Sequence, residues 1–391
     1  MCSERGTVPP RPGQRGLSLV EIMVGMVIAM VGIVVIFQML AVAEERKRSA
    51  SSGSDVQVTG VIAMSALDRD LREGGYGFAP AGFDAGVTPI MGCTVDAYDS
   101  ARPAPVFSFR LTPVQIVQGA GAASDTIIVL RGNSATFGAS LMFSESTDSS
   151  KRTRGRAGLN PRDYVLIGSN SPSLQCMLAE ITSTSDLDGL TVNHGLGVYS
   201  YTVFLADGTT QTLTRTARFN NPAPGLAFTT GFLFNLGNGA RRNIWTVQNG
   251  RLGFSNDLLH VDADGNGIND TTEVADNIVS LQAEYGIDAD NDGRITATEW
   301  TTADPGTTAG WANILAVRFG LLVRSAQFER SAVTTAVPGW TGGSFVITNL
   351  DGSDSGTTPA DPANNWRHYR YRVYENVIPL RNMLWGTRAS P

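Results

Sequence analysis

The hydrophobic pattern of the chain begins with one long apolar run. Residues 22–43 contain no charged side chain, and a helix of that length can cross a hydrocarbon core of ~30 Å. A polar leader with three arginines precedes the run, and Glu21 is the one acid at its start. A carboxylate inside a membrane segment costs about 3 kcal/mol or more unless another charge compensates it. The pattern predicts a membrane helix in which Glu21 has a charged partner.

A second apolar pattern follows at helical spacing. Residues three, four and seven positions apart share one face of a helix, so a stripe of apolar or small side chains is expected to face a folded domain. No proline lies between Pro12 and Pro80, so nothing interrupts a helix there, and Gly74–Gly75 predicts its end. We predict one helix with a membrane half, 17–43, and an amphipathic half, 44–75. The stripe consists of Val56, Gly60, Ala63, Met64, Leu67 and Leu71.

From residue 76 onward the pattern changes to short β-like runs separated by glycine, serine, asparagine and aspartate. Residues 314–324 alternate most clearly, with apolar side chains on one face and arginines on the other. A polar loop, 348–365, leads to a closing strand, 369–377. The 43 glycines fit a fold with many turns. Further predicted strands are 126–130, 164–167 and 199–205.

The start of the apolar run supplies a candidate partner for Glu21. Cleavage after Gly16 would free the α-amine of Leu17, which lies one helical turn before Glu21. These residues resemble the processing motif of the type IV pilin family and the related pseudopilins. The resemblance implies removal of the leader, 1–16, by a prepilin peptidase, N-methylation of Leu17, and pairing of Glu21 with a subunit's N-terminal amine during assembly. Leu17 replaces the usual phenylalanine and keeps the position apolar.

Two other kinds of N-terminal segment fit parts of this pattern. An ordinary secretory signal would explain Ala41-Val42-Ala43 as a cleavage site, but its apolar stretch has only about 7 to 15 residues and Glu21 would have no role. A plain signal-anchor helix explains the length of the run but again leaves Glu21 without a role. Sequencing of the mature N-terminus would separate the three alternatives.

Three later segments resemble PilW-type minor pilins: Leu67–Tyr76, Asn277–Asp288 and Ile378–Asn382. The resemblance implies an α+β, type IV pilin-like fold, in which the long N-terminal helix packs on a β-rich, mainly antiparallel head at residues 76–391. It implies a minor pilin that takes part in initiating type IV pilus assembly, as a structural subunit of the pilus or its tip complex. The implied partners are other minor pilins, the major pilin and a PilY-type tip adhesin. The implied location is the inner membrane, with the head in the periplasm, and then the pilus.

Two acidic segments, 262–273 and 288–299, carry the pattern D-x-[DN]-x-[DN]-G-x5-E in full. In this pattern alternate side-chain oxygens converge on one hard cation, a glycine allows the turn, a carbonyl at the seventh position contributes, and the final glutamate binds with two oxygens. We expect one or two calcium ions, and the alternative is acidic turns without metal. The candidate ligands are Asp262, Asp264, Asn266, Ile268, Asp270 and Glu273 in the first loop, and Asp288, Asp290, Asp292, Arg294, Thr296 and Glu299 in the second.

The segments that flank these loops do not resemble an EF-hand pair. Residues 251–261 are predicted to be extended, and Pro305 prevents an exiting helix after the second loop. Between the loops, the spacing of Val274, Ile278 and Leu281 favours a short helix that leads to a strand at 283–287. We therefore predict calcium loops inserted between β elements.

Charge and cysteine content narrow the class of protein further. The net charge is −6, and removal of residues 1–16 changes it to −8, so no nucleic-acid partner is expected. The only basic cluster, 151–156, is predicted to be a solvated loop. Without the leader, Cys93 and Cys176 remain, and an even pair in an oxidising compartment predicts a disulfide, with two buried thiols as the alternative.

The sequence gives little support for catalysis. Neither lysine follows a glycine, so no Gly-Lys phosphate loop is possible, and no G-x-S-x-G motif occurs. The three histidines are isolated and lack zinc-ligand spacing. We predict a protein that is not an enzyme. Two alternatives to a minor pilin stay open: a minor pseudopilin of a type II secretion system, and a secreted calcium-binding adhesion module.

Overall fold

The fold was analysed in a computed structural model, which describes residues 18–79, 90–135, 140–155, 158–169, 175–185, 189–221, 228 and 230–386. The chain divides into two compact units, Met1–Ser54 and Asp55–Pro391. Gly16 and Leu17, the predicted processing site, lie outside the described residues.

One helix, α1 (Leu19–Glu73), runs through both predicted halves of the N-terminal segment. The portion Leu19–Glu44 has a mean hydropathy of 2.8, is exposed throughout, and is long and apolar enough to span a membrane. In the second unit, the predicted stripe faces the head, because Val56, Ala63, Leu67 and Leu71 of α1 are all buried. The helix ends at Gly74 and Gly75, as predicted, and Gly75 has the left-handed φ of +82° that favours glycine.

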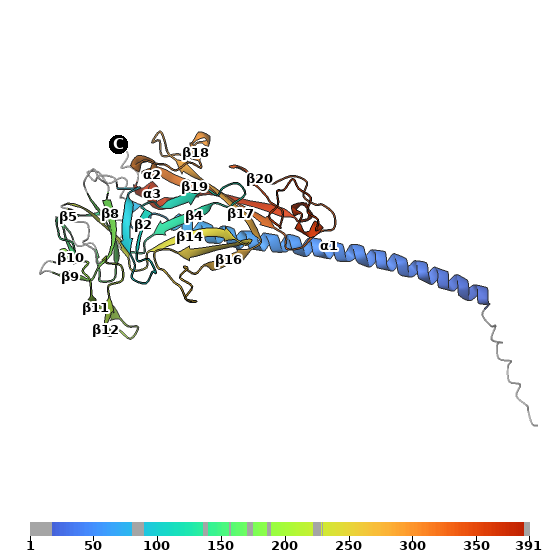
Figure 1. The fold of residues 1–391 in the computed structure, drawn as a ribbon, viewed down its shortest axis with the longest axis horizontal. Helices are drawn as coiled ribbons and strands as arrows, with labels where there is room; N and C mark the ends of the chain where they lie inside the picture. The colour runs from blue at the N-terminus through green and yellow to red at the C-terminus, as the bar shows by residue number, and fades with distance from the viewer. Residues whose placement is uncertain are drawn as a thin grey trace, which may run out of the picture. The chain divides into compact units, whose positions relative to one another are not determined.

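The head is built mainly from β-sheets, drawn from cyan to red in Figure 1. Its nine-stranded sheet is antiparallel except where β1 pairs with β8. In spatial order this sheet contains β2 (Val106–Arg110), β1 (Thr94–Tyr98), β8 (Gln175–Glu180), β7 (Tyr164–Ser169), β13 (Gly231–Gly237), β5 (Ser140–Ser146), β6 (Ser150–Thr153), β10 (Thr191–Asn193) and β9 (Ser183–Ser185).

Four smaller sheets complete the described part of the head. The five-stranded sheet contains β16 (Thr272–Asp276), β15 (Arg251–Asn256), β14 (Arg241–Gln248), β4 (Thr126–Arg131) and β3 (Val114–Val117). The four-stranded sheet contains β18 (Trp300–Thr301), β17 (Ile278–Ile287), β19 (Ile314–Arg324) and β22 (Tyr371–Pro379). Two hairpins contain β11 (Val198–Phe204) with β12 (Thr210–Thr216), and β20 (Gly339–Trp340) with β21 (Gly343–Ser344).

Short helices connect or follow the strands. They are α2 (Thr308–Ala312), α3 (Arg381–Gly386), and the 3-10 helices η2 (Ala297–Glu299), η3 (Pro362–Asn364) and η4 (Trp366–His368).

The second half of α1 packs closely against the four-stranded sheet. A Cβ atom on Gly60 would lie 2.1 Å from the ring of Tyr374 on β22, so only glycine fits at this crossing. The Tyr374 hydroxyl donates to the carbonyl oxygen of Val56 at 3.3 Å, and the Asn376 amide donates to Asp68 at 3.2 Å. These contacts join the C-terminal strand to the helix, although the two are more than 300 residues apart in the sequence.

The strand predicted at 314–324 is β19, and it is one of the two inner strands of the four-stranded sheet. One face lies in the main core, which α1 shares, whereas Leu322 on the other face packs against Phe345, Ile347 and Trp366. Both faces of β19 are therefore covered, whereas its alternating sequence predicts one buried face and one exposed face.

The short helix predicted between the two acidic loops is wrong. Residues 274–276 belong to strand β16 and residues 278–281 to strand β17, instead of a short helix. Asn277, with a left-handed φ of +58°, separates the two strands, and β17 has a bulge between Ile278 and Ser280. The bulge disturbs the alternation of side chains along the strand, which produced the helix-like spacing.

Two further predictions need correction. The closing strand β22 begins and ends two residues later than predicted, because η4 occupies 366–368 and Tyr369 caps it. The basic cluster at 151–156 is not a solvated loop over its first residues, since Lys151 lies in β6 and is 0% exposed. Strand β6 is an inner strand of its sheet, between β5 and β10, and the Lys151 ammonium group is held by the carbonyl of Thr147 beside buried His194. Arg156 lies outside the described residues.

Candidate functional site

The N-terminal candidate site is carried by the start of α1. Glu21 lies in the first turn of this helix, is exposed, and is followed by the apolar span. The N–H of Ile22 donates to the carbonyl of Ser18 at 3.1 Å, so the helical hydrogen bonds include the first described residue. An acid in a first helical turn is also favoured by the helix dipole.

The first acidic loop folds around its own carboxylates. Asp262 accepts hydrogen bonds from the N–H groups of Asn266 at 3.0 Å and Gly267 at 2.8 Å. Asp264 accepts from the same Asn266 N–H at 3.1 Å, and Asp270 accepts from Ala263 N–H at 2.9 Å. One oxygen from each of Asp262, Asp264 and Asp270 lies within 4.8 Å of the others.

The second loop repeats this network 26 residues later in the chain. Asp288 accepts from the N–H groups of Asp292 at 3.0 Å and Gly293 at 2.9 Å, and Asp290 accepts from Asp292 N–H at 3.2 Å. Asp288, Asp290 and Asp292 form a second oxygen cluster within 4.8 Å. Asp288 is buried, because the loop is attached to the start of β19 through the bond from its N–H to the carbonyl of Asn313.

The seventh-position residues close both turns in the same way. The N–H of Ile268 donates to the Asn266 side chain, and the N–H of Arg294 donates to the Asp292 side chain, both at 2.7 Å. The carbonyl groups of these two residues are the predicted ligands, and their side chains are exposed.

The glutamates at the twelfth positions lie outside both carboxylate clusters. Glu273, on β16, pairs with Arg251 at 2.9 Å. Glu299 bends back and accepts from the N–H groups of Ala289 at 2.9 Å and Thr296 at 2.7 Å, and these bonds lower its pKa. The clusters offer hard oxygen donors, which suit calcium, but neither contains the bidentate glutamate of an EF-hand.

Electrostatics keeps the carboxylate of Asp262 ionised. The N–H of Gly267 makes the largest contribution to lowering its pKa, because a carboxylate that accepts backbone bonds is stabilised in its charged form. Both clusters therefore combine negative charge with a fixed turn, and the residues present fit a hard cation.

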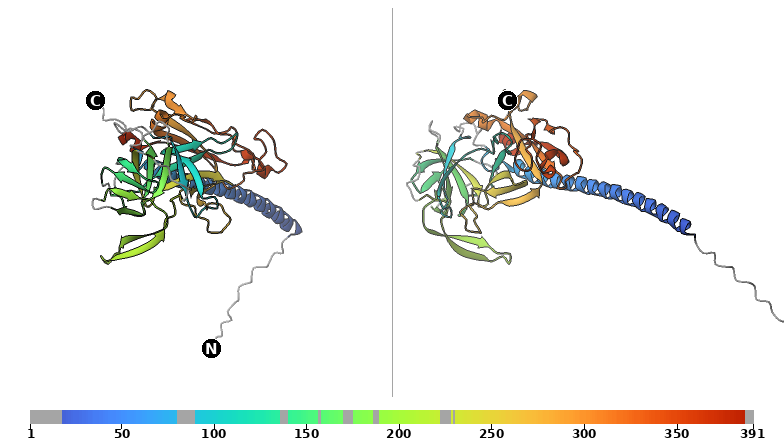
Figure 2. Two further views of the ribbon diagram at one scale, coloured as in Figure 1. Left: turned by 60° about the vertical axis from the view of Figure 1, so that its left-hand side comes forward. Right: turned by 45° about the vertical axis from the view of Figure 1, so that its right-hand side comes forward.

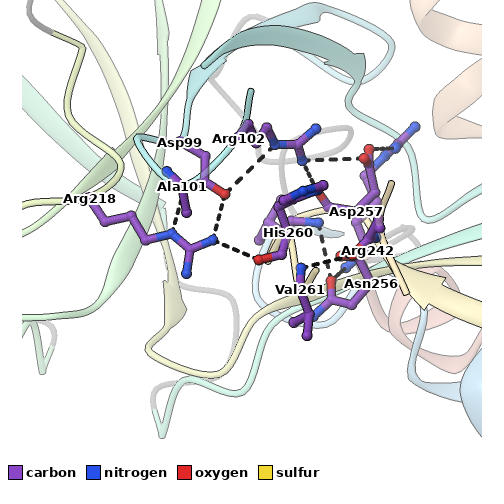
Figure 3. Close-up of polar contacts among 11 residues, drawn as sticks. Asp99, Ala101, Arg102, Arg218, Arg242, Asn256, Asp257, His260 and Val261 are labelled. Carbon is purple, nitrogen blue, oxygen red and sulfur yellow. Dashed lines mark hydrogen bonds and ion pairs between the residues drawn. The ribbon is translucent and has the colours of Figure 1, made fainter. Parts of the chain in front are cut away.

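A charged cluster at the base of the first loop was not predicted from the sequence (Figure 3). Asp99, which is fully buried, pairs with Arg218 through both carboxylate oxygens and with Arg102 at 3.7 Å. Asp257 pairs with Arg242 and, at 3.2 Å, with Arg102. The cluster joins the nine-stranded sheet to the five-stranded sheet, because Asp99 follows β1 and Arg242 lies on β14. Apart from Asp99 and Arg102, its members are too far apart in the sequence for any local signal.

The predicted disulfide between Cys93 and Cys176 is present. It joins the segment before β1 to β8, where these two strands run parallel, and both cysteines are buried. The bond connects residues that are 83 positions apart and holds the start of β1 beside β8.

Two family models match the chain at the regions described above. Residues 11–37 match the prokaryotic N-terminal methylation motif, and residues 244–382 match the family of the type IV pilus-assembly protein W. The second region runs from β14 to α3 and contains both acidic loops. No curated protein and no solved structure matches the chain.

The membrane-length span Leu19–Glu44 overlaps the matched methylation motif, and a β-rich head follows it, which is the arrangement of a type IV pilin. Within that class, the match at residues 244–382 is that of a PilW-type minor pilin, which confirms the family inferred from the sequence. Such regions indicate a structural protein that is processed at its N-terminus, anchored in a membrane, and in contact with other pilus components.

Proposed function

We propose that this protein is a minor pilin that takes part in initiating type IV pilus assembly, as a structural subunit of the pilus or its tip complex. Prepilin peptidase would cleave after Gly16, and Leu17 would then be methylated. One observation carries the proposal. Glu21 lies in the first turn of α1, before its apolar span, and is part of the matched methylation motif. A carboxylate there is costly in a membrane and becomes favourable beside another subunit's N-terminal amine.

The Glu21→Gln variant of the full chain tests this role. It removes the charge but keeps the size of the side chain, so we expect membrane insertion to persist while incorporation into pili is lost. Mass spectrometry of the mature N-terminus checks processing, and immunodetection in sheared pili measures incorporation. Glu44→Gln is the control, because it removes an acid at the other end of the same span. Normal piliation by Glu21→Gln would contradict the proposal, and a defect in protein secretion with normal pili would indicate the pseudopilin alternative.

We also propose that the two acidic loops bind calcium. The support is the convergence of three carboxylates in each loop around turns closed by backbone N–H groups. Calorimetric titration of the full chain in detergent with calcium chloride should show saturable binding. Asp262→Asn and Asp288→Asn should each remove one part of the signal.

A matched control exists outside the loops. Asp351 accepts the N–H of Ser353 at 3.0 Å in a similar exposed turn, but it belongs to neither carboxylate cluster. Asp351→Asn should therefore leave the titration unchanged. A flat titration of the unmodified chain would exclude the calcium proposal.

A further inference from the structure

The hairpin formed by β11 and β12, called the arm below, projects from the head in both Figure 1 and Figure 2. Its strands pair only with each other among the described residues, in register from Val198 opposite Thr216 to Phe204 opposite Thr210. The arm therefore has two outer edges that no described strand covers. Strand β9 lies near β11, so the edge of β12 is the more open one.

The base of the arm is held firmly by one buried carboxylate. Glu180, on β8, is 0% exposed and accepts a hydrogen bond from the hydroxyl of Tyr199 on β11. It also pairs with Arg215 of β12 at 3.2 Å and accepts the N–H of Arg218 at 2.9 Å. These bonds fix both strands of the arm to the nine-stranded sheet, and they neutralise the one basic side chain of the arm.

The pairing register determines which backbone groups face the open edge. The N–H of Ala217 donates to Gly197, and the N–H of Leu205 donates to Thr209, both at 2.9 Å. Because hydrogen-bonded pairs alternate in antiparallel strands, the odd-numbered residues of β12 bond inward to β11. The even-numbered residues direct their N–H and C=O groups outward. They are Thr210, Thr212, Thr214 and Thr216.

The same four threonines place their side chains on one face of the arm, since side chains alternate along a strand. On β11 this face presents Phe204, which is 84% exposed, and Val198, which is 72% exposed. No charged side chain lies on this face, and Arg215, the one charged residue of β12, lies on the opposite face and pairs with Glu180. Natural edge strands are commonly protected by charges, proline or a covering segment. Among the described residues, β12 has no proline and no strand beyond it, and its one charge, Arg215, is held by Glu180 at the base of the arm.

An exposed row of alternating N–H and C=O groups is complementary to another extended strand. A phosphate, a nucleic acid or a charged lipid would require free basic side chains, and the one basic side chain of this strand, Arg215, is paired with Glu180. We propose that the edge of β12 binds an extended, uncharged strand of another pilus subunit, which adds to the arm by main-chain hydrogen bonds. The identity of the partner as a pilus subunit rests on the proposed function.

Photo-crosslinking of the full chain in pilus-producing cells tests this inference. A p-benzoylphenylalanine at position 212 should crosslink to a pilus subunit identified by mass spectrometry. The same probe at Thr202 is the matched control, because Thr202 is also exposed and lies opposite Thr212, but on β11, one strand away from the open edge. We expect a strong product from position 212 and about tenfold less from position 202.

A second pair of variants separates backbone pairing from side-chain contact. Thr214→Pro, with the probe at position 212, removes an outward N–H that makes no bond within the arm, and should reduce crosslinking about tenfold. Thr214→Ala keeps this N–H and should retain crosslinking within about twofold. Retention of the Cys93–Cys176 disulfide in each variant shows that the head has folded.

The outcomes distinguish this inference from the proposed function. If the chain enters pili but positions 212 and 202 crosslink equally, or the proline variant has no effect, strand addition at β12 is wrong and the minor pilin proposal stands. Crosslinks only between copies of this chain would replace the proposed partner with a second copy. If the unmodified chain never enters pili, the proposed function itself fails.

Discussion

The Nζ atom of Lys151 lies 3.2 Å from Nε2 of His194, and both side chains are buried. Nζ also donates to the carbonyl of Thr147 at 2.6 Å. Desolvation lowers the pKa of Lys151 to about 8. Desolvation, together with the neighbouring ammonium group, lowers the pKa of His194 to about 3. At neutral pH a neutral His194 ring thus faces a charged lysine in the interior of the head.

This pair predicts that the head loses stability as the pH falls below about 6.5. The pKa of His194 is lower in the folded than in the unfolded chain, so the unfolded chain binds the proton first and is favoured by acid. We expect a loss of about 1–2 kcal/mol between pH 7 and pH 5 from this residue. Chemical denaturation at several pH values measures the loss.

Two variants test the cause of the pH dependence. Lys151→Met removes the nearby charge and should raise the pKa of His194, as followed by NMR of the ring. His368→Gln is the control, because His368 is only half-buried and bonds to the carbonyl of Glu329. An unchanged His194 pKa in Lys151→Met would contradict the electrostatic explanation.

The contact between α1 and the five-stranded sheet predicts a strong dependence on Asp70. This buried carboxylate accepts from the indole N–H of Trp245 at 2.7 Å and the amide of Asn243 at 2.9 Å, and pairs with Arg131 at 3.1 Å. Asp70→Ala leaves all three donors without this acceptor, so we expect a loss of about 3 kcal/mol in unfolding free energy. Asp68→Ala, two residues earlier on a more exposed face, should cost about 1 kcal/mol or less. Equal effects of the two variants would contradict this interpretation.

The close crossing at Gly60 predicts opposite effects of one substitution at two positions of α1. Gly60→Ala places a methyl group against the ring of Tyr374 and should destabilise the head by about 1–3 kcal/mol. Gly53→Ala is the matched control, because nothing lies within 4 Å of a Cβ at that position. Alanine should there favour the helix by up to about 1 kcal/mol. Thermal melts monitored by circular dichroism, together with protease resistance of the head, compare the two variants.

Local patterns predicted the features that depend on neighbouring residues. The turns at Asp262 and Asp288 form within six residues, so the loop motif was sufficient to locate them. The orientation of Glu273 depends on pairing between β15 and β16, which brings Arg251 beside it. The motif alone contains no information on that contact. The motif therefore predicted Glu273 as a ligand, whereas the structure pairs it with Arg251.

Contacts between distant segments account for the rest of the differences. The sequence around Lys151 predicts a basic loop, but the residue lies in β6, which pairs with β5 and β10. Asp99 pairs with Arg218, which is 119 residues away in the sequence. The long helix and strand β19 were predictable, because each shows its own period over many residues. The open edge of β12 required the register of the arm.

The last prediction concerns the Cys93–Cys176 disulfide, which closes a loop across 83 positions. Because a crosslink of this span restricts the unfolded chain, replacing both cysteines by serine should cost about 3–5 kcal/mol of unfolding free energy. The loss should appear under oxidising conditions and disappear when the unmodified protein is compared after reduction. Near-ultraviolet circular dichroism during denaturant titration follows the head selectively, since Phe37 is the one aromatic residue of α1. Equal stability of the oxidised protein and the double variant would show that native contacts alone hold β1 beside β8.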